Sequence, residues 1–454
     1  MKKLTVVFFV FFSLVMIPLA ASAETAKALI EKGDALVKTG KYDKAIHAYT
    51  KAMEKNPKDE KAYYKRALCY RSLSFRFPEK EQLFLKDVNG ALALNPNYSD
   101  AYIIKGKHYQ RKKDHERAFR NYNTAIEVNP EYEQAYIARG NAYLNAGKHK
   151  EALKDYNRAI EINPHNPKGF IARGWAYGML KKNQQAVDDY DKAVELGRDS
   201  AETYFARGRF FHWTLRDNQK ALNDFNRAIE IDPKNTSVYQ SRAYVYSDLK
   251  NYQQSISDFT RLIELEPHRA LWYSGRAGIY FSLKQYDKAL EDLGKAIELD
   301  PENDFSYARR AGFYTRLEKY EDAITDYTKA IELKPGYKSH YSSRGKAAEK
   351  IGNFYQAVKD YTKTIELDPQ DHYSYGRRAD LNVKMGKYQE AVEDFTKVIE
   401  LKKNDKYIYR TYRKRYNAYE KLGKHDLAVE DLKTAARLGN KLAQTTLRRK
   451  AVQW

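Results

Sequence analysis

Apolar and small residues recur along this chain in pairs of stretches, each with the spacing of an α-helix. In residues 272–305, Tyr273, Ala277 and Tyr280 are four and three positions apart, so they lie on one face of a helix. A second stripe of the same kind occupies 289–297. A short polar stretch separates the two stripes. The pattern therefore predicts two helices joined by a tight turn.

This helix pair recurs along almost the whole chain, and proline marks its period. Proline has no N–H to donate inside a helix and disfavours helical backbone in the residue before it, so each one ends a helix. The prolines spaced 34 residues apart are Pro96, Pro130 and Pro164, and then Pro233, Pro267, Pro301, Pro335 and Pro369. We count twelve repeats between about Lys27 and Asn440. The expected fold class is all-α.

Each predicted helix keeps one position for a small residue. In the first helix of each pair it holds Gly33, Ala67, Gly106, Gly140, Gly174, Gly208, Ala243, Ala277, Ala311, Gly345 and Ala379. In the second helix it holds Ala118, Ala152, Ala186, Ala221, Ala289, Ala323, Ala357, Ala391 and Ala428. A missing side chain lets the paired helices approach closely. Large neighbours such as Tyr156 and Tyr327 fill the remaining space, so packing explains most of the 39 tyrosines.

These residues resemble the tetratricopeptide repeat (TPR) family. One repeat matches the family pattern almost completely, with Ala135, Tyr136, Arg139, Gly140, Tyr143, Gly147, Ala152, Tyr156, Ala159 and Pro164. The resemblance covers essentially all of the chain after residue 23. It implies a right-handed superhelical α-solenoid of about twelve helix-turn-helix repeats with a concave inner face. It also implies a non-enzymatic protein that binds other proteins or peptides.

Several repeats depart from the regular period. The second has five extra residues around 75–82, the sixth has one near 212–217, and the last has three before Tyr412. Two segments, Leu196-Gly197 and Leu438-Gly439, resemble the related Sel1-type variant. We expect these places to bend or loosen the stack.

The chain divides into three parts on this interpretation. Residues 1–23 are a targeting segment, 24–440 form the TPR solenoid, and 441–454 form a capping helix. A repeat array needs a cap because its last repeat otherwise exposes an apolar face. The residues expected to cover that face are Leu442, Leu447 and Trp454.

Charged residues also recur with the period of the repeat. The residue before the small position of each first helix is basic, and most second helices carry an aspartate about sixteen residues later. Arg276 and Asp292 are one such pair. The two repeats with Lys32 and Lys105 in place of arginine also lack the aspartate, and arginine alone can fork onto a carboxylate. We expect these residues to pair within or between repeats. The alternative is a basic track that holds an anionic ligand.

First-helix positions beside the packed stripe line the inner face of TPR proteins. In the middle of this chain those positions are aromatic, and exposed aromatic side chains make favourable peptide-binding surfaces. The candidate partner-binding residues are Trp175, Phe205, His212, Trp213 and Tyr244, with Phe281 and Phe305 as further members. The alternative is that some of them fill the core between repeats, above all Phe281 and Phe305.

Residues 402–424 form a second candidate surface, because basic residues alternate there with tyrosines. The candidate basic residues are Lys402, Lys403, Arg410, Arg413 and Lys414. In an exported protein, an anionic lipid, lipopolysaccharide or an acidic protein is a better-fitting partner than nucleic acid. The alternative is a solvated basic face with no partner.

The N-terminus predicts export. Lys2 and Lys3 precede the apolar run 4–19, and Ala21-Ser22-Ala23 fits signal-peptidase cleavage before Glu24. The mature protein is then expected in the periplasm or outside the cell, without a membrane span. The alternative is that the apolar run stays as an anchor.

Composition narrows the function classes. The chain has 454 residues, a net charge of +21 and one cysteine, so an intramolecular disulfide and a cysteine-rich zinc site are excluded. We interpret Cys69 as a small buried hydrophobic residue. No catalytic, metal-binding or cofactor-binding motif is present. We therefore expect no enzyme and no cofactor, but an exported scaffold or adaptor that binds a protein or peptide in its groove. The alternative is a basic envelope protein that docks electrostatically to anionic polymer, lipopolysaccharide or membrane surface.

Overall fold

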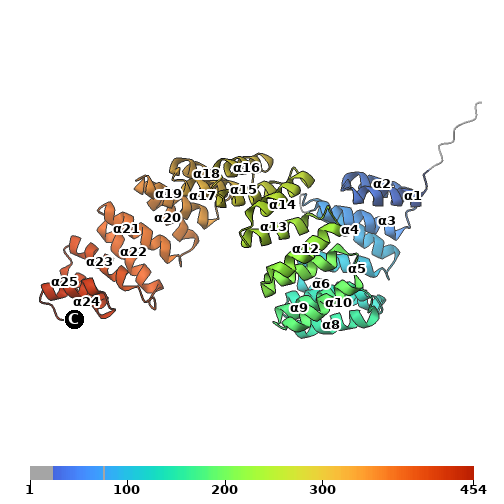
Figure 1. Cartoon of the computed structure of the whole chain (residues 1–454), viewed down its shortest axis with the longest axis horizontal. Helices are drawn as coiled ribbons and strands as arrows, with labels where there is room; N and C mark the ends of the chain where they lie inside the picture. Colours follow the sequence, from blue (N-terminus) through green and yellow to red (C-terminus); the bar gives the residue numbers. More distant parts are fainter. Residues whose placement is uncertain (1–23, 75–76) are drawn as a thin grey trace, which may run out of the picture. The chain divides into compact units, whose positions relative to one another are not determined.

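A computed structural model describes residues 24–74 and 77–454. These residues form 25 α-helices, a short π-helix and no strand (Figure 1), which confirms the all-α class. The chain divides into two compact units, 1–217 and 218–454, and each is described by itself. The targeting segment 1–23 lies outside the described residues.

The N-terminal unit is built of helical hairpins. Its first helices are α1 Ala26–Lys38, α3 Glu60–Leu73, α5 Ser99–Arg111, α7 Glu133–Asn145, α9 Pro167–Met179 and α11 Ala201–Phe210, which continues as π-helix η1 Phe211–Leu215. Its second helices are α2 Tyr42–Lys55, α4 Lys80–Leu94, α6 His115–Val128, α8 His149–Ile162 and α10 Asn183–Leu196.

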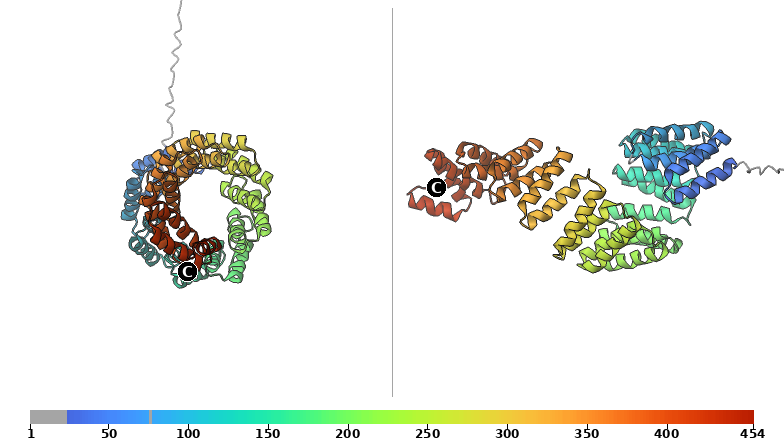
Figure 2. Two further views of the ribbon diagram at one scale, coloured as in Figure 1. Left: turned by 90° about the vertical axis from the view of Figure 1, so that its left-hand side faces the viewer. Right: turned by 90° about the horizontal axis from the view of Figure 1, so that it is seen from above.

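The C-terminal unit begins with α12 Asn218–Ile231 and continues the same alternation. Its first helices are α13 Thr236–Asp248, α15 Ala270–Ser282, α17 Asp304–Arg316, α19 Lys338–Lys350, α21 His372–Lys384 and α23 Tyr409–Lys421. Its second helices are α14 Tyr252–Leu265, α16 Tyr286–Leu299, α18 Tyr320–Leu333, α20 Phe354–Leu367, α22 Tyr388–Leu401 and α24 His425–Arg437, and α25 Lys441–Arg449 follows. Figure 2 shows consecutive hairpins side by side within each unit.

Local sequence sets the helix ends. Asn303 caps α17 by accepting a hydrogen bond from the Phe305 N–H at 3.1 Å. Pro301 lies two residues after the end of α16, as its missing N–H predicts. Gly147 and Gly352 have φ of 73° and 77°, so a residue without a Cβ suits the turns that follow α7 and α19.

Tyrosine rings fill the space that the small residues leave. A Cβ added at Gly106 or Gly140 would lie 2.6 Å from the ring of Tyr122 or Tyr156. Both rings are fully buried, and the Tyr156 hydroxyl donates a hydrogen bond to Asn141 Oδ1 at 2.8 Å. The packing role expected for these tyrosines is therefore confirmed. Cys69 is also buried, and burial raises the pKa of its thiol to about 11.

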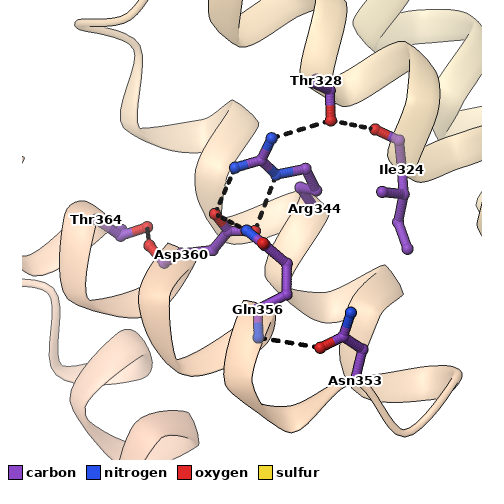
Figure 3. A network of polar contacts seen from close by, with 7 residues as sticks. All are labelled: Ile324, Thr328, Arg344, Asn353, Gln356, Asp360 and Thr364. Atoms are coloured by element: carbon purple, nitrogen blue, oxygen red, sulfur yellow. Dashed lines mark hydrogen bonds and ion pairs between the residues drawn. The ribbon is translucent and has the colours of Figure 1, made fainter.

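The expected arginine–aspartate pairing is confirmed, and it lies within each hairpin. In Figure 3, Arg344 Nε and Nη2 donate to the two carboxylate oxygens of Asp360 at 3.0 and 2.7 Å. The Asp360 side chain is almost completely buried, and it also accepts from Gln356. The same fork occurs in Arg66–Asp87, Arg139–Asp155, Arg173–Asp189, Arg242–Asp258, Arg276–Asp292, Arg310–Asp326, Arg378–Asp394 and Arg415–Asp431.

A third bond connects neighbouring hairpins at these arginines except Arg310, which has Gly294 at the corresponding place of the preceding hairpin. Arg344 Nη1 donates to Thr328 Oγ1 at 2.9 Å, on the second helix of the preceding hairpin. Arg139 and Arg173 make the corresponding bond to Asn123 and Asn157. One guanidinium thus holds three helices in register, and the periodic Asn or Thr is a signal that the sequence interpretation missed.

The irregular repeats are accommodated locally. The extra residue of the sixth repeat lies in η1, where one turn of π-helix absorbs it. The extra residues of the second and last repeats lengthen the α3–α4 and α22–α23 connections, although 75 and 76 lie outside the described residues.

The C-terminal helix packs differently from the expectation. Leu447 is buried as predicted, but Leu442 and Trp454 are 50% and 39% exposed. Ala443 is buried instead, because it lies one turn before Leu447 on the same face of α25.

Candidate protein-binding surface

Within the helical hairpins, more large apolar side chains are exposed on the first helices than on the second helices. Those within first helices or η1 are Trp175, Met179, Trp213, Tyr244, Leu271, Phe305 and Tyr373. On second helices, the exposed large apolar residues are Leu94, Tyr355, Leu367 and Leu427. All four lie close to a helix end, as do Met179, Leu271, Phe305 and Tyr373 on the first helices. The first helices therefore present an apolar surface that packing within the hairpins does not require.

In the N-terminal unit this surface centres on Trp175, whose side chain is 42% exposed. Met179 lies four residues later on the same face of α9 and is 54% exposed. The Arg209 guanidinium lies 5.9 Å from the Trp175 ring centre and 5.7 Å from that of half-buried Phe205. The three side chains form an aromatic and cationic cluster on adjacent first helices.

Within η1, the neighbouring residues His212 and Trp213 have opposite environments. Trp213 is 52% exposed, as expected for a partner-binding residue. His212 is only 1% exposed, so the expectation that it lies on the binding surface was wrong. Its ring packs edge-on against Trp213, with the ring centres 4.4 Å apart. The wider turn of a π-helix rotates the two side chains, and their burial does not follow from α-helical spacing.

In the C-terminal unit the exposed apolar residues follow the repeat. Leu271, Phe305 and Tyr373 occupy the same position of their first helices. Tyr244 occupies a different position, in the middle of α13, and is 38% exposed. Leu271 and Tyr373 were missed, although their separation from Phe305 by 34 or 68 residues is visible in the sequence. Phe305 is 62% exposed, so its alternative as a core residue is wrong.

Phe281 belongs to the packing between hairpins. It is half-buried and stacks on Phe313 of the next first helix, with ring centres 4.0 Å apart. The alternative stated for this residue is therefore confirmed.

A cluster of basic side chains lies on the first helices of the N-terminal unit. It comprises Arg71, Lys107, Arg111 and Lys168. Surrounding protein lowers the pKa of Lys107, and the charges of Arg71 and Lys168 lower it further. Burial and then Arg111 lower the pKa of Arg71. These residues are up to 97 positions apart, so sequence inspection did not group them.

The predicted basic surface near α23 is partly neutralised. Lys402 pairs with Asp405 at 2.9 Å and Lys414 with Asp380 at 2.7 Å. Lys403 is exposed. Arg410 and Arg413 line a pocket of about 410 Å³ together with Lys414, and the pocket walls also include Tyr409, Asn417 and Asn440.

Two kinds of feature are absent from the described part of the chain. None of its helices has the length and apolar character needed to cross a bilayer. Between residues 24 and 454, with 75 and 76 set aside, no group of three or more His, Cys, Asp or Glu side chains is arranged to hold a metal ion.

Sequence models described as tetratricopeptide repeat or TPR repeat match more than half of the chain. The matched residues are 33–73, 99–132, 133–166, 201–235, 225–257, 270–303, 306–337, 341–371 and 372–405. The chain belongs to the tetratricopeptide repeat family. The resemblance seen in the sequence is thereby confirmed.

Curated relatives of this TPR chain match only part of its length. Hsp70-Hsp90 organizing protein 1 of Glycine max is 38% identical over 92 residues, which are 20% of this chain and 15% of that protein. RNA polymerase II-associated protein 3 of Homo sapiens is 38% identical over 104 residues, 21% of this chain and 15% of that protein. The similarity thus spans a small fraction of each relative.

Solved structures match this chain at low sequence identity. Yeast Tom70 matches with 18% identity and a TM-score of 0.41, over 93% of this chain and 99% of the Tom70 chain. A tetratricopeptide repeat protein from Parabacteroides merdae matches with 21% identity and a TM-score of 0.39, over 56% of this chain and 98% of that chain.

Proposed function

We propose that this TPR chain is an exported, non-enzymatic adaptor that binds a protein or peptide through its first helices. The observation that carries the proposal is that more large apolar residues are exposed on the first helices than on the second helices, with Trp175 and Tyr244 in the middle of their helices. Burying an aromatic ring against a partner removes a large apolar area from water and costs little conformational entropy, because few rotatable bonds of the side chain become fixed. Trp175 and Trp213 are the leading anchors because each is about half exposed.

The adaptor function is tested by crosslinking the tagged full chain in cells of its source and comparing variants. Trp213→Ala and Trp175→Ala are expected to lose a partner that the wild-type chain captures. The matched control is Tyr355→Ala, because Tyr355 is 76% exposed but lies on a second helix. Equal capture by all four proteins would contradict the proposed surface.

Export rests on residues 1–23, which have the charge, apolar run and cleavage site of a secretory signal. The expected mature N-terminus is Glu24. Cell fractionation and the intact mass of the purified protein test this point. A full-length mass in the cytoplasmic fraction would contradict export.

The second candidate function is electrostatic docking to an anionic envelope surface. Two observations favour it: the basic cluster around Lys107, whose pKa is lowered by burial and by the charges of Arg71 and Lys168, and the pocket lined by Arg410 and Arg413. Salt separates the two functions, because mobile ions screen exposed charges. Loss of partner binding between about 50 and 200 mM salt favours electrostatic docking. Salt-tolerant binding that Trp213→Ala abolishes favours the adaptor.

A further inference from the structure

Some first helices carry a basic residue two positions before the small residue, and this residue reaches toward the preceding first helix. Lys65 Nζ lies 2.5 Å from Asp34 of α1. Lys414 Nζ lies 2.7 Å from Asp380 of α21. The aspartate occupies the same place in both cases, 31 residues before Lys65 and 34 before Lys414, whose repeat has three extra residues.

Arg309 of α17 has the same place but lacks this partner. The residue 31 positions before it is Gly278, so the carboxylate that Asp34 and Asp380 supply in their repeats is missing. A Cβ at Gly278 would overlap with Arg309 Nη2, which shows that the guanidinium lies against this glycine. Arg309 Nη1 donates to Ser274 Oγ at 3.3 Å. No carboxylate of the described residues lies within ion-pair distance of Arg309.

The environment of Arg309 differs from that of the next residue, Arg310. Arg310 forks onto Asp326 like the other arginines of its column, and hydrogen bonding to that carboxylate raises its pKa. Burial instead lowers the pKa of Arg309. A cation that has lost part of its hydration and has no anion beside it is unfavourable, and an incoming carboxylate relieves this cost.

Exposed apolar residues lie on the helix of Arg309 and on the two preceding first helices. Phe305 lies four residues earlier on the same face of α17, and Leu271 lies three residues before Ser274 on α15. The Tyr244 side chain of α13 is close enough to influence the Arg309 charge. All three apolar side chains are more than a third exposed. A peptide that crosses α13, α15 and α17 can therefore contact apolar side chains as well as the guanidinium.

We propose that Arg309 binds the side-chain carboxylate of an Asp or Glu inside a peptide segment of the partner protein. Apolar residues on either side of that carboxylate contact Tyr244, Leu271 and Phe305. An internal residue fits better than a chain end, because exposed apolar residues lie on first helices both before α17, at Tyr244 and Leu271, and after it, at Tyr373. The proposal rests on the adaptor function and specifies the chemistry of its ligand.

The test is a selection of displayed random 12-residue peptides, with amidated C-termini, on the purified full chain. The wild-type protein is expected to enrich peptides that carry Asp or Glu between apolar residues at least about tenfold over their amide counterparts, the factor that 1.4 kcal/mol represents. Arg309→Met is expected to enrich apolar peptides without this acidic preference. Melting of Arg309→Met should stay within a few degrees of wild type, because no intramolecular ion pair is lost.

A second variant restores the missing carboxylate. Gly278→Asp places an aspartate where Asp34 and Asp380 lie in their repeats, and the flexible Arg309 side chain has only to move its tip. We expect a higher melting temperature and loss of the acidic preference. The matched control is Gly278→Asn, which has the same shape without the charge and is expected to keep part of that preference.

The outcomes separate the two proposals. Enrichment of apolar peptides with no acidic preference in the wild type overturns the Arg309 site and leaves the adaptor function standing. Enrichment seen only when the same peptides carry a free C-terminal carboxylate also overturns it. Failure to enrich any peptide overturns both, as does an acidic preference that survives Arg309→Met and Gly278→Asp.

Discussion

At the scale of single residues, the arginine that precedes the small residue of a first helix forms hydrogen bonds that connect neighbouring helices. Arg276 shows the arrangement. It forks onto Asp292 at 2.8 and 2.9 Å and reaches Thr260 of the preceding hairpin at 3.1 Å. The Asp292 side chain is 7% exposed, so the carboxylate depends on the guanidinium for its charge compensation.

We expect Arg276→Met to destabilise the C-terminal unit by about 3 kcal/mol, because it leaves a buried carboxylate without its partner. Changing Asp292 to Leu in the same chain should recover part of that loss. Urea unfolding of the two variants measures the difference. Arg261→Met is the control, because Arg261 pairs with Glu264 at the surface and should change stability by about 0.5 kcal/mol or less. Strictly additive effects of Arg276→Met and Asp292→Leu would contradict the coupling.

Glycines of one hairpin differ in what they face. A Cβ at Gly275 would overlap with the ring of Phe259, whereas nothing lies within 4 Å of a Cβ at Gly294. Both residues are helical, so both gain the same helix propensity on substitution by alanine.

We therefore expect opposite effects of one chemical change. Gly294→Ala should stabilise the C-terminal unit by about 0.5–1 kcal/mol, since alanine loses less backbone conformational entropy on folding than glycine does. Gly275→Ala should destabilise by about 1–3 kcal/mol, because the methyl group displaces a buried ring. Thermal unfolding of the two variants checks the signs. Equal stabilisation by both would show that Phe259 moves away without cost.

At the scale of elements, the repeats accommodate extra residues at the end of a helix or in the connection between two helices. One additional residue in the sixth repeat becomes a turn of π-helix, and three in the last repeat lengthen a connection. Neither insertion lies in the stripes that pack α13 to α24 against one another. The second helices keep their full length of 13 or 14 residues throughout the C-terminal unit.

The C-terminal helix offers a test of capping. Leu447 is fully buried, whereas Leu442 is half exposed on the same short helix. Leu447→Ala should cost about 2–5 kcal/mol locally and raise amide exchange in α23, α24 and α25. Leu442→Ala should change little, about 0.5 kcal/mol at most. Similar exchange in both variants would contradict the role of α25 as a cap.

At the scale of the whole molecule, contacts join each hairpin to its immediate neighbours. Helix pairs in contact within the C-terminal unit are consecutive helices or first helices of adjacent hairpins, such as α17 and α19. Stability in such an array is close to a sum of local terms.

This locality predicts how damage spreads. Arg276→Met should raise amide hydrogen exchange in α14 to α16, where its bonds lie, and leave α23 and α24 unchanged. Hydrogen exchange followed by mass spectrometry measures each helix in one experiment. A uniform increase along the C-terminal unit would show that it unfolds as one cooperative body.

Much of the candidate surface follows from the repeat. Once one first helix is aligned, Leu271, Phe305 and Tyr373 fall at the same place, and each is exposed. The basic cluster does not follow, because Arg71 and Lys168 belong to different hairpins and meet only when the first helices stack. The third bond, which Arg139, Arg173 and Arg344 make, also crosses between hairpins, and the periodic Asn or Thr that accepts it was missed in the sequence.

The repeating helical hairpin, its helix ends and its small-against-large packing are written in the chain, because each depends on residues within about one turn or one hairpin of one another. The burial of His212, the exposure of Leu442 and the lack of a carboxylate beside Arg309 became visible only in three dimensions. Each of these depends on which side chain a neighbouring helix brings to that place. Spacing along one helix contains no information about that choice.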